Sequence, residues 1–361
     1  MIKLIVAFFS SFTMSIVILR CKNLHLHFSA DIENSGPQKN HTGLTPRIGG
    51  LAIILGIFLA TILNLEQVGG VNFNVLLLLS ALPTFFIGLL EDITKKISVK
   101  GRLLATASSA ILLIYMLGIQ IMSFGIPYLD LLFSIPAFSL IFTIFAITGL
   151  SNAYNIIDGF HGLASMVGII TLLAIAYVSY TFFDYELMIL SLIMAAAILG
   201  FFILNYPLGL IFLGDGGAYL IGFWIASLSI AIVMRNPEIS PWFAFLVNCY
   251  PISETLFTLY RRRIHQNKNP GLPDAIHFHT LIYKRILLPT VFKPNPVSAN
   301  ASTAPYLWIL TILSIIPAIL WFKSTPLLIL FSGIFLALYI WLYTQIVRFK
   351  TPKWIQYLKI F

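Results

Sequence analysis

The chain has 361 residues, of which 59% are hydrophobic and only 10% are charged, and its mean hydropathy is +0.93. About a quarter of the residues of an ordinary soluble domain are charged, so this composition excludes a soluble globular protein. The formal net charge is +9, and the two cysteines, Cys21 and Cys249, form neither a disulfide framework nor a zinc motif.

Hydrophobic segments of membrane-spanning length recur along the whole chain. Each is close to the roughly 17 to 25 residues that a spanning helix needs. We therefore predict an all-α polytopic membrane protein with about 10–11 transmembrane helices, forming one integral membrane domain over residues 1–361. The expected spans are 2–19, 48–65, 75–90, 103–121, 131–150, 162–183, 187–204, 218–234, 243–259, 305–322 and 326–345. The first is expected to be an uncleaved span, because no small-residue cleavage site follows it.

The basic residues predict the orientation of these spans. With the N-terminus outside and the C-terminus in the cytoplasm, 19 of the 22 Lys and Arg residues fall in cytoplasmic stretches. The positive charge is then a topology signal, and no nucleic-acid partner is needed to explain it. The long polar segment 260–304 is predicted to be a structured cytoplasmic loop, and its start, Arg261–Arg263, is expected to anchor the ninth span at the membrane surface.

The residues most informative about chemistry are acids and amides beside apolar runs, because ionisable groups at membrane depth persist mainly when paired or functional. Glu91 and Asp92 directly follow the third span. Adjacent carboxylates can share a Mg²⁺ and phosphate site, and Lys100 and Arg102 supply charge for anionic partners. The structural alternative is a solvated helix end.

A second and a third cluster flank later spans. Asn152, Asn155 and Asp158 would share one face of a helix, although Asn and Asp-Gly also form ordinary turns. Asp215 stands among glycines, starting with Gly214, just before an apolar helix. Glycines permit close approach of the backbone to a ligand, and a helix N-terminus can receive phosphate, so we favour a functional site here over a membrane-entry turn.

The fourth cluster lies in the long basic loop. His277 and His279 are followed by Arg285, and histidines two residues apart face the same way only in extended structure. Hydrogen bonding to a diphosphate is therefore more plausible than a helical metal pair. Arg47 before the second span is a candidate phosphate or lipid contact or a topological anchor, and Glu254 inside the ninth span is expected to pair with a neighbouring base.

Together these clusters place acids, amides and bases on one membrane face. This is the inventory for Mg²⁺-assisted phosphoryl transfer, in which one or two carboxylates hold the ion and cationic side chains neutralise phosphates. The chain has no soluble domain for a large substrate, so we expect one substrate to come from the lipid bilayer.

At these clusters the sequence closely resembles the polyprenyl-phosphate N-acetylhexosamine-1-phosphate transferases. The resemblance runs from Pro46 to Arg285 and includes Asn-Ala-x-Asn-x-x-Asp-Gly, Phe-Leu-Gly-Asp-Gly-Gly and Pro-Asp-x-x-His-x-His in the family's order. It implies a cytoplasmic-face cleft in a bacterial inner membrane. It also implies transfer of a sugar 1-phosphate from a UDP-N-acetylhexosamine to undecaprenyl phosphate, releasing UMP, as the first membrane step of a surface glycan such as O-antigen or capsule.

The resemblance further implies a cofactor and residue roles. The cofactor would be Mg²⁺, for which Mn²⁺ can substitute. The metal ligands would be Asp215 and Asn155. The catalytic carboxylates would be Asp92, Asp158 and Glu91, and the substrate would be bound by Asn152, Lys100, Arg102, His277, His279, Arg285, Arg47 and Gly214.

Three residues depart from the family's pattern. Glu91 replaces the first Asp of a pair, and its extra methylene argues against a nucleophilic role. Lys95 stands where the priming enzymes of the family often carry Asp, and His161 replaces the later Asp of the second motif, which removes one acid from the cleft. The last change is expected to alter the sugar pocket.

Several alternatives stay open at this point. UDP-N-acetylglucosamine is the default donor, with UDP-N-acetylfucosamine or UDP-N-acetylquinovosamine as alternatives. A transporter or lipid carrier would also be polytopic, but transporters tend to place charges near the bilayer midplane and to show repeated halves. A family member without catalysis would serve as an assembly partner. The sequence does not decide between a monomer and a homodimer.

Overall fold

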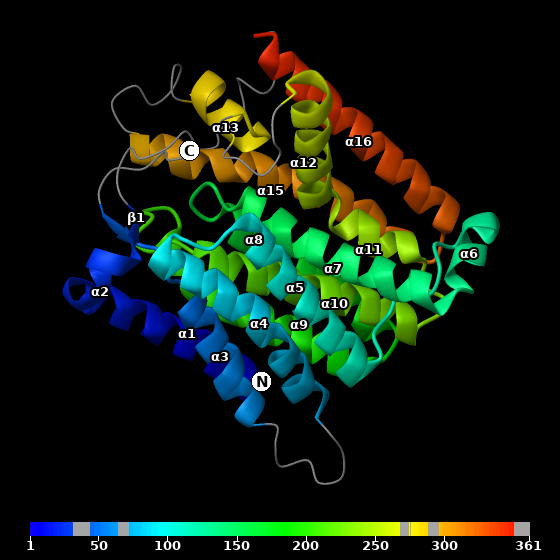
Figure 1. Ribbon diagram of the computed structural model, residues 1–361, viewed down its shortest axis with the longest axis horizontal. Coiled ribbons are helices and arrows are strands. Elements are labelled where there is room, and N and C mark those ends of the chain that lie inside the picture. Colours follow the sequence, from blue (N-terminus) through cyan, green and yellow to red (C-terminus); the bar gives the residue numbers. More distant parts are fainter. Residues whose placement is uncertain (32–43, 64–71, 268–273, 275, 288–295, 350–361) are drawn as a thin grey trace.

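The computed structural model describes residues 1–31, 44–63, 72–267, 274, 276–287 and 296–349, and most of them are helical (Figure 1). A short antiparallel pair, β1 (Ala30–Asp31) and β2 (Thr45–Pro46), is the only sheet in these ranges. The helices are α1 (Ile2–Arg20), α2 (Lys22–Ser29), α3 (Gly50–Ile62), α4 (Phe73–Thr94), α5 (Val99–Leu117), α6 (Pro127–Phe133), α7 (Pro136–Ile157), α8 (Leu163–Thr181), α9 (Tyr185–Asn205), α10 (Gly214–Arg235), α11 (Pro241–Val247), α12 (Cys249–Tyr260), α13 (Phe278–Ile282), α15 (Pro296–Leu320) and α16 (Thr325–Val347).

The predicted polytopic all-α class is confirmed. Each of the eleven expected spans overlaps a helix, and nine helices in the described ranges are long and apolar enough to cross a membrane. The ninth expected span is broken between α11 and α12. Pro251 has no N–H to donate to the carbonyl of Val247, and that carbonyl is 3.3 Å from Thr171 Oγ1 instead. A side-chain donor from α8 therefore compensates the break.

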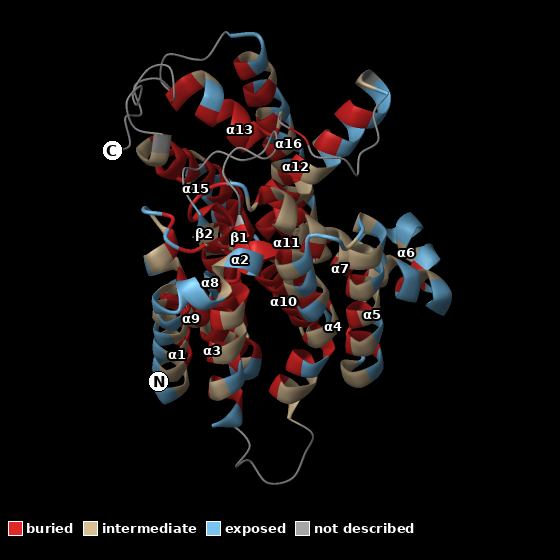
Figure 2. Cartoon of the chain, turned by 60° about the vertical axis from the view of Figure 1, so that its left-hand side comes forward, coloured by how far each residue is buried: buried red, intermediate tan, exposed pale blue. Residues whose placement is uncertain are grey.

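Helix α10 lies at the centre of the bundle. It packs against α3, α4, α7 and α8, and 89% of its most apolar 18-residue stretch is buried inside the protein. Figure 2 shows this contrast with the partly exposed outer helices, such as α1 and α6. A helix that is apolar on all sides either faces lipid or is surrounded by other elements, and α10 is of the second kind. Any acid on α10 is thus held in a fixed position.

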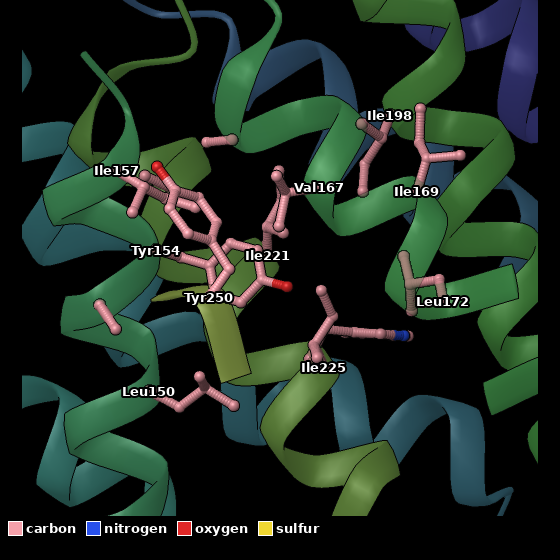
Figure 3. Close-up of a cluster of buried hydrophobic side chains, with 14 of the residues drawn as sticks. Leu150, Tyr154, Ile157, Val167, Ile169, Leu172, Ile198, Ile221, Ile225 and Tyr250 are labelled. Carbon is pink, nitrogen blue, oxygen red and sulfur yellow. The ribbon is translucent and has the colours of Figure 1, made fainter. Parts of the chain in front are cut away.

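A buried cluster joins α10 to its neighbours (Figure 3). Ile221 and Ile225 of α10 meet side chains from α7, α8 and α9, and Tyr154 and Tyr250 bring α7 and α12 to the same cluster. Because lipid is as apolar as these side chains, close packing rather than exclusion of water holds such helices together.

The α4–α5 hairpin presents the first acidic cluster at one end of the bundle. Helix α4 ends at Thr94, and the next residue, Lys95, adopts a left-handed conformation with φ of 54°. Helix α5 starts after Ser98, whose side chain accepts a hydrogen bond from the N–H of Gly101 at 3.1 Å. This turn brings the C-terminal end of α4 and the N-terminal end of α5 side by side.

The segment predicted as a cytoplasmic loop, 260–304, is partly helical. It contains α13, two π-helical turns and the first residues of α15, while 268–273, 275 and 288–295 lie outside the described residues. Figure 2 shows α13 at one end of the molecule, with the N-terminus at the other. Arg261 was expected to be a surface anchor, but it is 8% exposed and forms an ion pair with Asp274. Its role is therefore to hold the loop against α12.

Candidate active site

The N-terminal turn of α10 carries Asp215, and the end of α4 carries Asp92. The carboxylate of Asp92 accepts hydrogen bonds from the backbone N–H groups of Asp215 at 2.8 Å and Gly216 at 2.9 Å. These are two of the N–H groups that a helix start leaves without an intrahelical partner. Both acids are 2% exposed. Asp92 thus caps α10 and fixes the position of Asp215.

Glycines allow the backbone to approach closely at this junction. Gly214 has φ of +78°, and a Cβ there would lie 2.6 Å from an oxygen of Asp92 and 2.4 Å from the carbonyl oxygen of Arg47. A Cβ on Gly50 at the start of α3 would lie 2.4 Å from the backbone nitrogen of Gly217. Gly50 and Gly214 are thus needed because α3 and α10 begin against each other.

Two guanidinium groups neutralise Asp215. Arg47 forms an ion pair with one oxygen of Asp215 and lies 3.3 Å from Asp92, and Arg102 on α5 pairs with the other oxygen of Asp215. Arg47 and Arg102 are 168 and 113 residues from Asp215 in the sequence. A buried carboxylate requires such partners, and guanidinium groups also bind phosphate in the same geometry.

The amide cluster lies beside this centre on α7. Asn155 lies beside the side chain of Asp215, and Asn152 accepts a hydrogen bond from Tyr219 at 3.4 Å. Asp158 follows the last residue of α7, and burial raises its pKa to about 7 against the opposing charge of Arg47. Tyr219 was not among the predicted site residues. Its spacing of four residues from Asp215 on a helix was the signal that could have identified it.

Two other predicted residues lie at the edge of the centre. Glu91 accepts a hydrogen bond from the backbone N–H of Ile97 at 2.7 Å, which closes the turn after α4. Lys100 is exposed on the first turn of α5, where it can contact an anionic partner that approaches the protein surface. Lys95 donates a hydrogen bond to the carbonyl of Ala30 and so ties the end of α4 to β1.

The two histidines lie at the start of α13, outside the central bundle: His277 directly precedes the helix and His279 is in its first turn. Their rings stack with centroids 5.2 Å apart, and His277 Nδ1 lies 2.9 Å from Glu254. The expectation that Glu254 pairs with a base is confirmed. His279 reaches the turn after α7, since a Cβ on Gly159 would lie 3.0 Å from its Nε2. Its buried Nδ1 has no hydrogen-bond partner among the described residues, so a ligand or water can use it.

Arg285 and His161 are engaged elsewhere. The guanidinium of Arg285 donates to the carbonyls of Ile346 and Val347, at 2.9 and 2.5 Å, and thereby caps α16. The side chain of His161 is buried with Nδ1 3.2 Å from the carbonyl oxygen of Pro207. The structure does not bring either side chain to Asp215. His161, which stands in place of the family's acid, therefore contacts the backbone at Pro207.

The burial of His279 makes a prediction about stability and pH. Burial lowers its pKa to about 3, although the charge of Glu254 opposes this shift. The unfolded state then binds one more proton than the folded state between about pH 6.5 and 3, so stability falls as pH falls, by up to about 1.4 kcal/mol per pH unit. Thermal unfolding of the purified protein should therefore show a smaller loss from pH 7 to 5 for His279→Gln than for the wild type. Equal losses would show that His279 is not buried in its neutral form.

The residues present fit a magnesium ion only in part. Within the described ranges, no three His, Cys, Asp or Glu side chains group closely enough to hold a metal by themselves. Asp215 and the amide of Asn155 offer oxygen ligands, and Mg²⁺ is commonly bound by one or two carboxylates together with substrate phosphates. The donor set therefore fits an ion that arrives with, or is completed by, a diphosphate.

Comparison with known proteins agrees with this arrangement of motifs. The model of the family described as "Glycosyl transferase family 4" matches residues 74–233, which contain the first three clusters. The undecaprenyl-phosphate alpha-N-acetylglucosaminyl 1-phosphate transferase of Escherichia coli (strain K12) is 31% identical over 266 residues, which are 68% of this chain and 67% of the relative. The chain belongs to glycosyl transferase family 4.

More relatives extend this result. The transferase of the same name from Yersinia pestis is 28% identical over 260 residues, covering 70% of this chain and 69% of the relative. The phospho-N-acetylmuramoyl-pentapeptide-transferase of Oceanobacillus iheyensis is 30% identical over 250 residues, covering 65% and 76%. The family 4 chain is thus a multi-pass membrane enzyme, a sugar-1-phosphate transferase of the polyprenyl-phosphate N-acetylhexosamine-1-phosphate type.

Proposed function

We propose that this enzyme transfers N-acetylglucosamine 1-phosphate from UDP-N-acetylglucosamine to undecaprenyl phosphate, as the first membrane step of a surface polysaccharide. The names of the E. coli and Y. pestis relatives, which give undecaprenyl phosphate and N-acetylglucosaminyl 1-phosphate, support this choice of acceptor and transferred group. We place the enzyme in a bacterial inner membrane, with the N-terminus outside and the Asp215 end of the bundle facing the cytoplasm. The distribution of Lys and Arg supports this orientation.

One observation carries the proposal: Asp215, at the start of a buried helix, forms ion pairs with two arginines and lies beside an amide. Phosphate oxygens are the alternative partners of Arg47 and Arg102, so both guanidinium groups can turn to a diphosphate that approaches Asp215. Lys100 at the rim adds charge for the lipid phosphate. Asp158 and Asn152 line the same end of α7, and Gly214, which has no Cβ, lets the carbonyl of Arg47 and the carboxylate of Asp92 approach the start of α10.

The chemistry is a displacement at phosphorus. An oxygen of undecaprenyl phosphate attacks the sugar-proximal phosphorus of the donor, the new P–O bond forms, and the bond to the UMP oxygen breaks. Magnesium, held by Asp215 and Asn155, would neutralise charge that develops on the diphosphate. We favour a single displacement, because a phosphate monoester is already largely ionised near neutral pH. A labelled phosphoryl-enzyme trapped without lipid would contradict this choice.

The decisive experiment measures UMP release by the purified protein in lipid. Undecaprenyl phosphate is supplied with UDP-N-acetylglucosamine, UDP-N-acetylfucosamine or UDP-N-acetylquinovosamine, and with Mg²⁺, Mn²⁺ or EDTA. We expect lipid-dependent release with UDP-N-acetylglucosamine that EDTA abolishes. Release with another sugar alone would correct the donor, and no release with any donor from folded protein would favour a non-catalytic assembly partner.

Replacing His279 by alanine is expected to weaken use of the donor. The neutral imidazole can donate or accept a hydrogen bond beside the Asp158–Gly159 turn, and its loss should raise the KM for the UDP-sugar about 10-fold, with a smaller change in the KM for the lipid. Steady-state kinetics with each substrate varied in turn measures both values. An unchanged dependence on UDP-sugar concentration would remove His279 from the donor site.

A further inference from the structure

A buried polar network outside the Asp215 centre connects α12, α16 and the histidine segment. Its central residue is Glu254 on α12, which is 0% exposed. We propose that Glu254 is a positioning residue for donor binding, which acts through His277 to hold His279 beside the Asp158–Gly159 turn. This inference rests on the proposed function, because it assigns Glu254 to the use of the UDP-sugar.

Both oxygens of Glu254 are committed to partners on other elements. One lies 2.9 Å from His277 Nδ1 and also accepts a hydrogen bond from the backbone N–H of Phe278 at 3.2 Å. The other accepts a hydrogen bond from the hydroxyl of Tyr339 on α16 at 2.8 Å. A fully buried carboxylate is costly unless it is bonded in this way. Glu254 therefore determines where the backbone and the ring at 277–278 lie.

The position of His277 is passed on to His279 through direct contact. The two rings are nearly parallel, with an interplanar angle of 14°. His279 also packs edge-on to Phe160, with centroids 5.4 Å apart, and its Nε2 faces Gly159 so closely that a Cβ there would be 3.0 Å away. The imidazole of His279 is therefore in contact with His277 and with Phe160 and faces Gly159. A shift of the His277 ring must therefore move His279 relative to Asp158.

A second set of contacts holds the same segment without Glu254. Arg261 pairs with Asp274, and Asp274 accepts a hydrogen bond from the N–H of Ile276 at 3.2 Å. The hydroxyl of Tyr343 donates to the carbonyl of Ile276 at 2.9 Å. The segment should consequently stay docked on α12 and α16 when the charge of Glu254 is removed. What changes is the orientation of the histidines, and this separates positioning from folding.

The test compares Glu254→Gln with Tyr339→Phe as the matched control. Both variants disturb the same buried carboxylate, but only the first removes the negative charge beside His277. We expect Glu254→Gln to raise the KM for UDP-N-acetylglucosamine about 10-fold or more, because small misplacements of a binding group have large kinetic effects, and to change the KM for undecaprenyl phosphate less than about 2-fold. Tyr339→Phe should change the donor KM less than about 3-fold. If Glu254→Gln does not fold, Glu254→Asp, which keeps the charge but is shorter by one methylene, should show the same selective rise.

A double-mutant cycle supplies the second readout. If Glu254 acts through His277, then Glu254→Gln should have no further effect on the donor KM in a His277→Ala background. A donor KM equal to that of the wild type, or an effect that adds fully to His277→Ala, would overturn the inference. The wild type is the reference for the proposed function: its failure to release UMP from any donor would refute that function, whereas an active wild type with normal variants would refute only the role of Glu254.

Discussion

Replacing Asp215 by asparagine is expected to lower kcat about 1000-fold or more while the protein remains folded in the membrane. Asparagine keeps the shape of the side chain but removes the charge that pairs with Arg47 and Arg102 and that would hold a magnesium ion. Loss of one preorganised electrostatic partner costs about 100- to 1000-fold in other enzymes, and a metal ligand adds to that. UMP release by the purified variant, with Mg²⁺ varied, measures the effect.

The control for Asp215→Asn is the same exchange at Asp184. Asp184 caps the start of α9, at the opposite end of that helix from the α9–α10 connection, and accepts a hydrogen bond from the N–H of Leu187 at 3.1 Å. Asp184 also lies 3.3 Å from Arg235, but Arg235 keeps its 2.9 Å ion pair with Glu186 when Asp184 is replaced. Asparagine is an equally good N-cap, so activity and unfolding temperature should stay close to the wild type. Normal turnover by Asp215→Asn would show that the metal and catalytic centre lies elsewhere.

Replacing Asp92 by asparagine is expected to lower both activity and stability. Asparagine offers one carbonyl oxygen and turns an NH₂ group toward a backbone N–H at the start of α10, where two acceptors are needed. A buried donor left without a partner costs about 1 to 3 kcal/mol, and the shift of Asp215 should reduce kcat about 100-fold or more. Thermal unfolding and UMP release on the same sample measure both effects.

The pH profile of Asp92→Asn distinguishes two roles of the carboxylate. If Asp92 removes a proton from the lipid phosphate, activity should recover above about pH 6, where a phosphate monoester loses that proton unaided. If Asp92 acts by capping α10, the loss should be the same at every pH. We expect the second result, because both oxygens are already engaged. Asp130→Asn is the control, since Asp130 also accepts two hydrogen bonds, from Phe124 N–H and Ser123, at 2.6 and 2.9 Å, and should affect stability alone.

Composition and periodicity were sufficient for the membrane class and for the helices. Runs of apolar residues report burial in lipid or in the bundle, and both environments require the same helical backbone hydrogen bonding. The helix boundaries differ from the predicted ones where a capping residue is present. Helix α5 begins at Val99, earlier than expected, because Ser98 caps it. The break between α11 and α12 was not predicted, although Pro251 was its visible cause in the sequence.

The residue types of the candidate site were also readable from the chain. The acid among glycines at position 215 favoured a functional site by itself, because such a group is costly beside an apolar span. The amides Asn152 and Asn155 also fitted an ordinary turn, and Arg47 also fitted a topological anchor, so these residues became informative only when the clusters were considered together. Their proximity was inferred only from a shared membrane face. The structure places Arg47 and Asn155 at the side chain of Asp215, although Arg47 is 168 residues away in the sequence.

The division of labour among the charged residues depended on the tertiary structure. Asp92 and Glu91 are neighbours in sequence, yet Asp92 holds the start of α10 and Glu91 holds the turn at Ile97. Arg285 binds the end of α16, and Arg261 is buried against Asp274. Sequence spacing indicates which side chains share a face of one helix. Which side chain a charged residue pairs with depends on how the helices pack against one another. The type of chemistry could therefore be predicted from local sequence patterns, whereas the role of each charged residue could be assigned only from the tertiary structure.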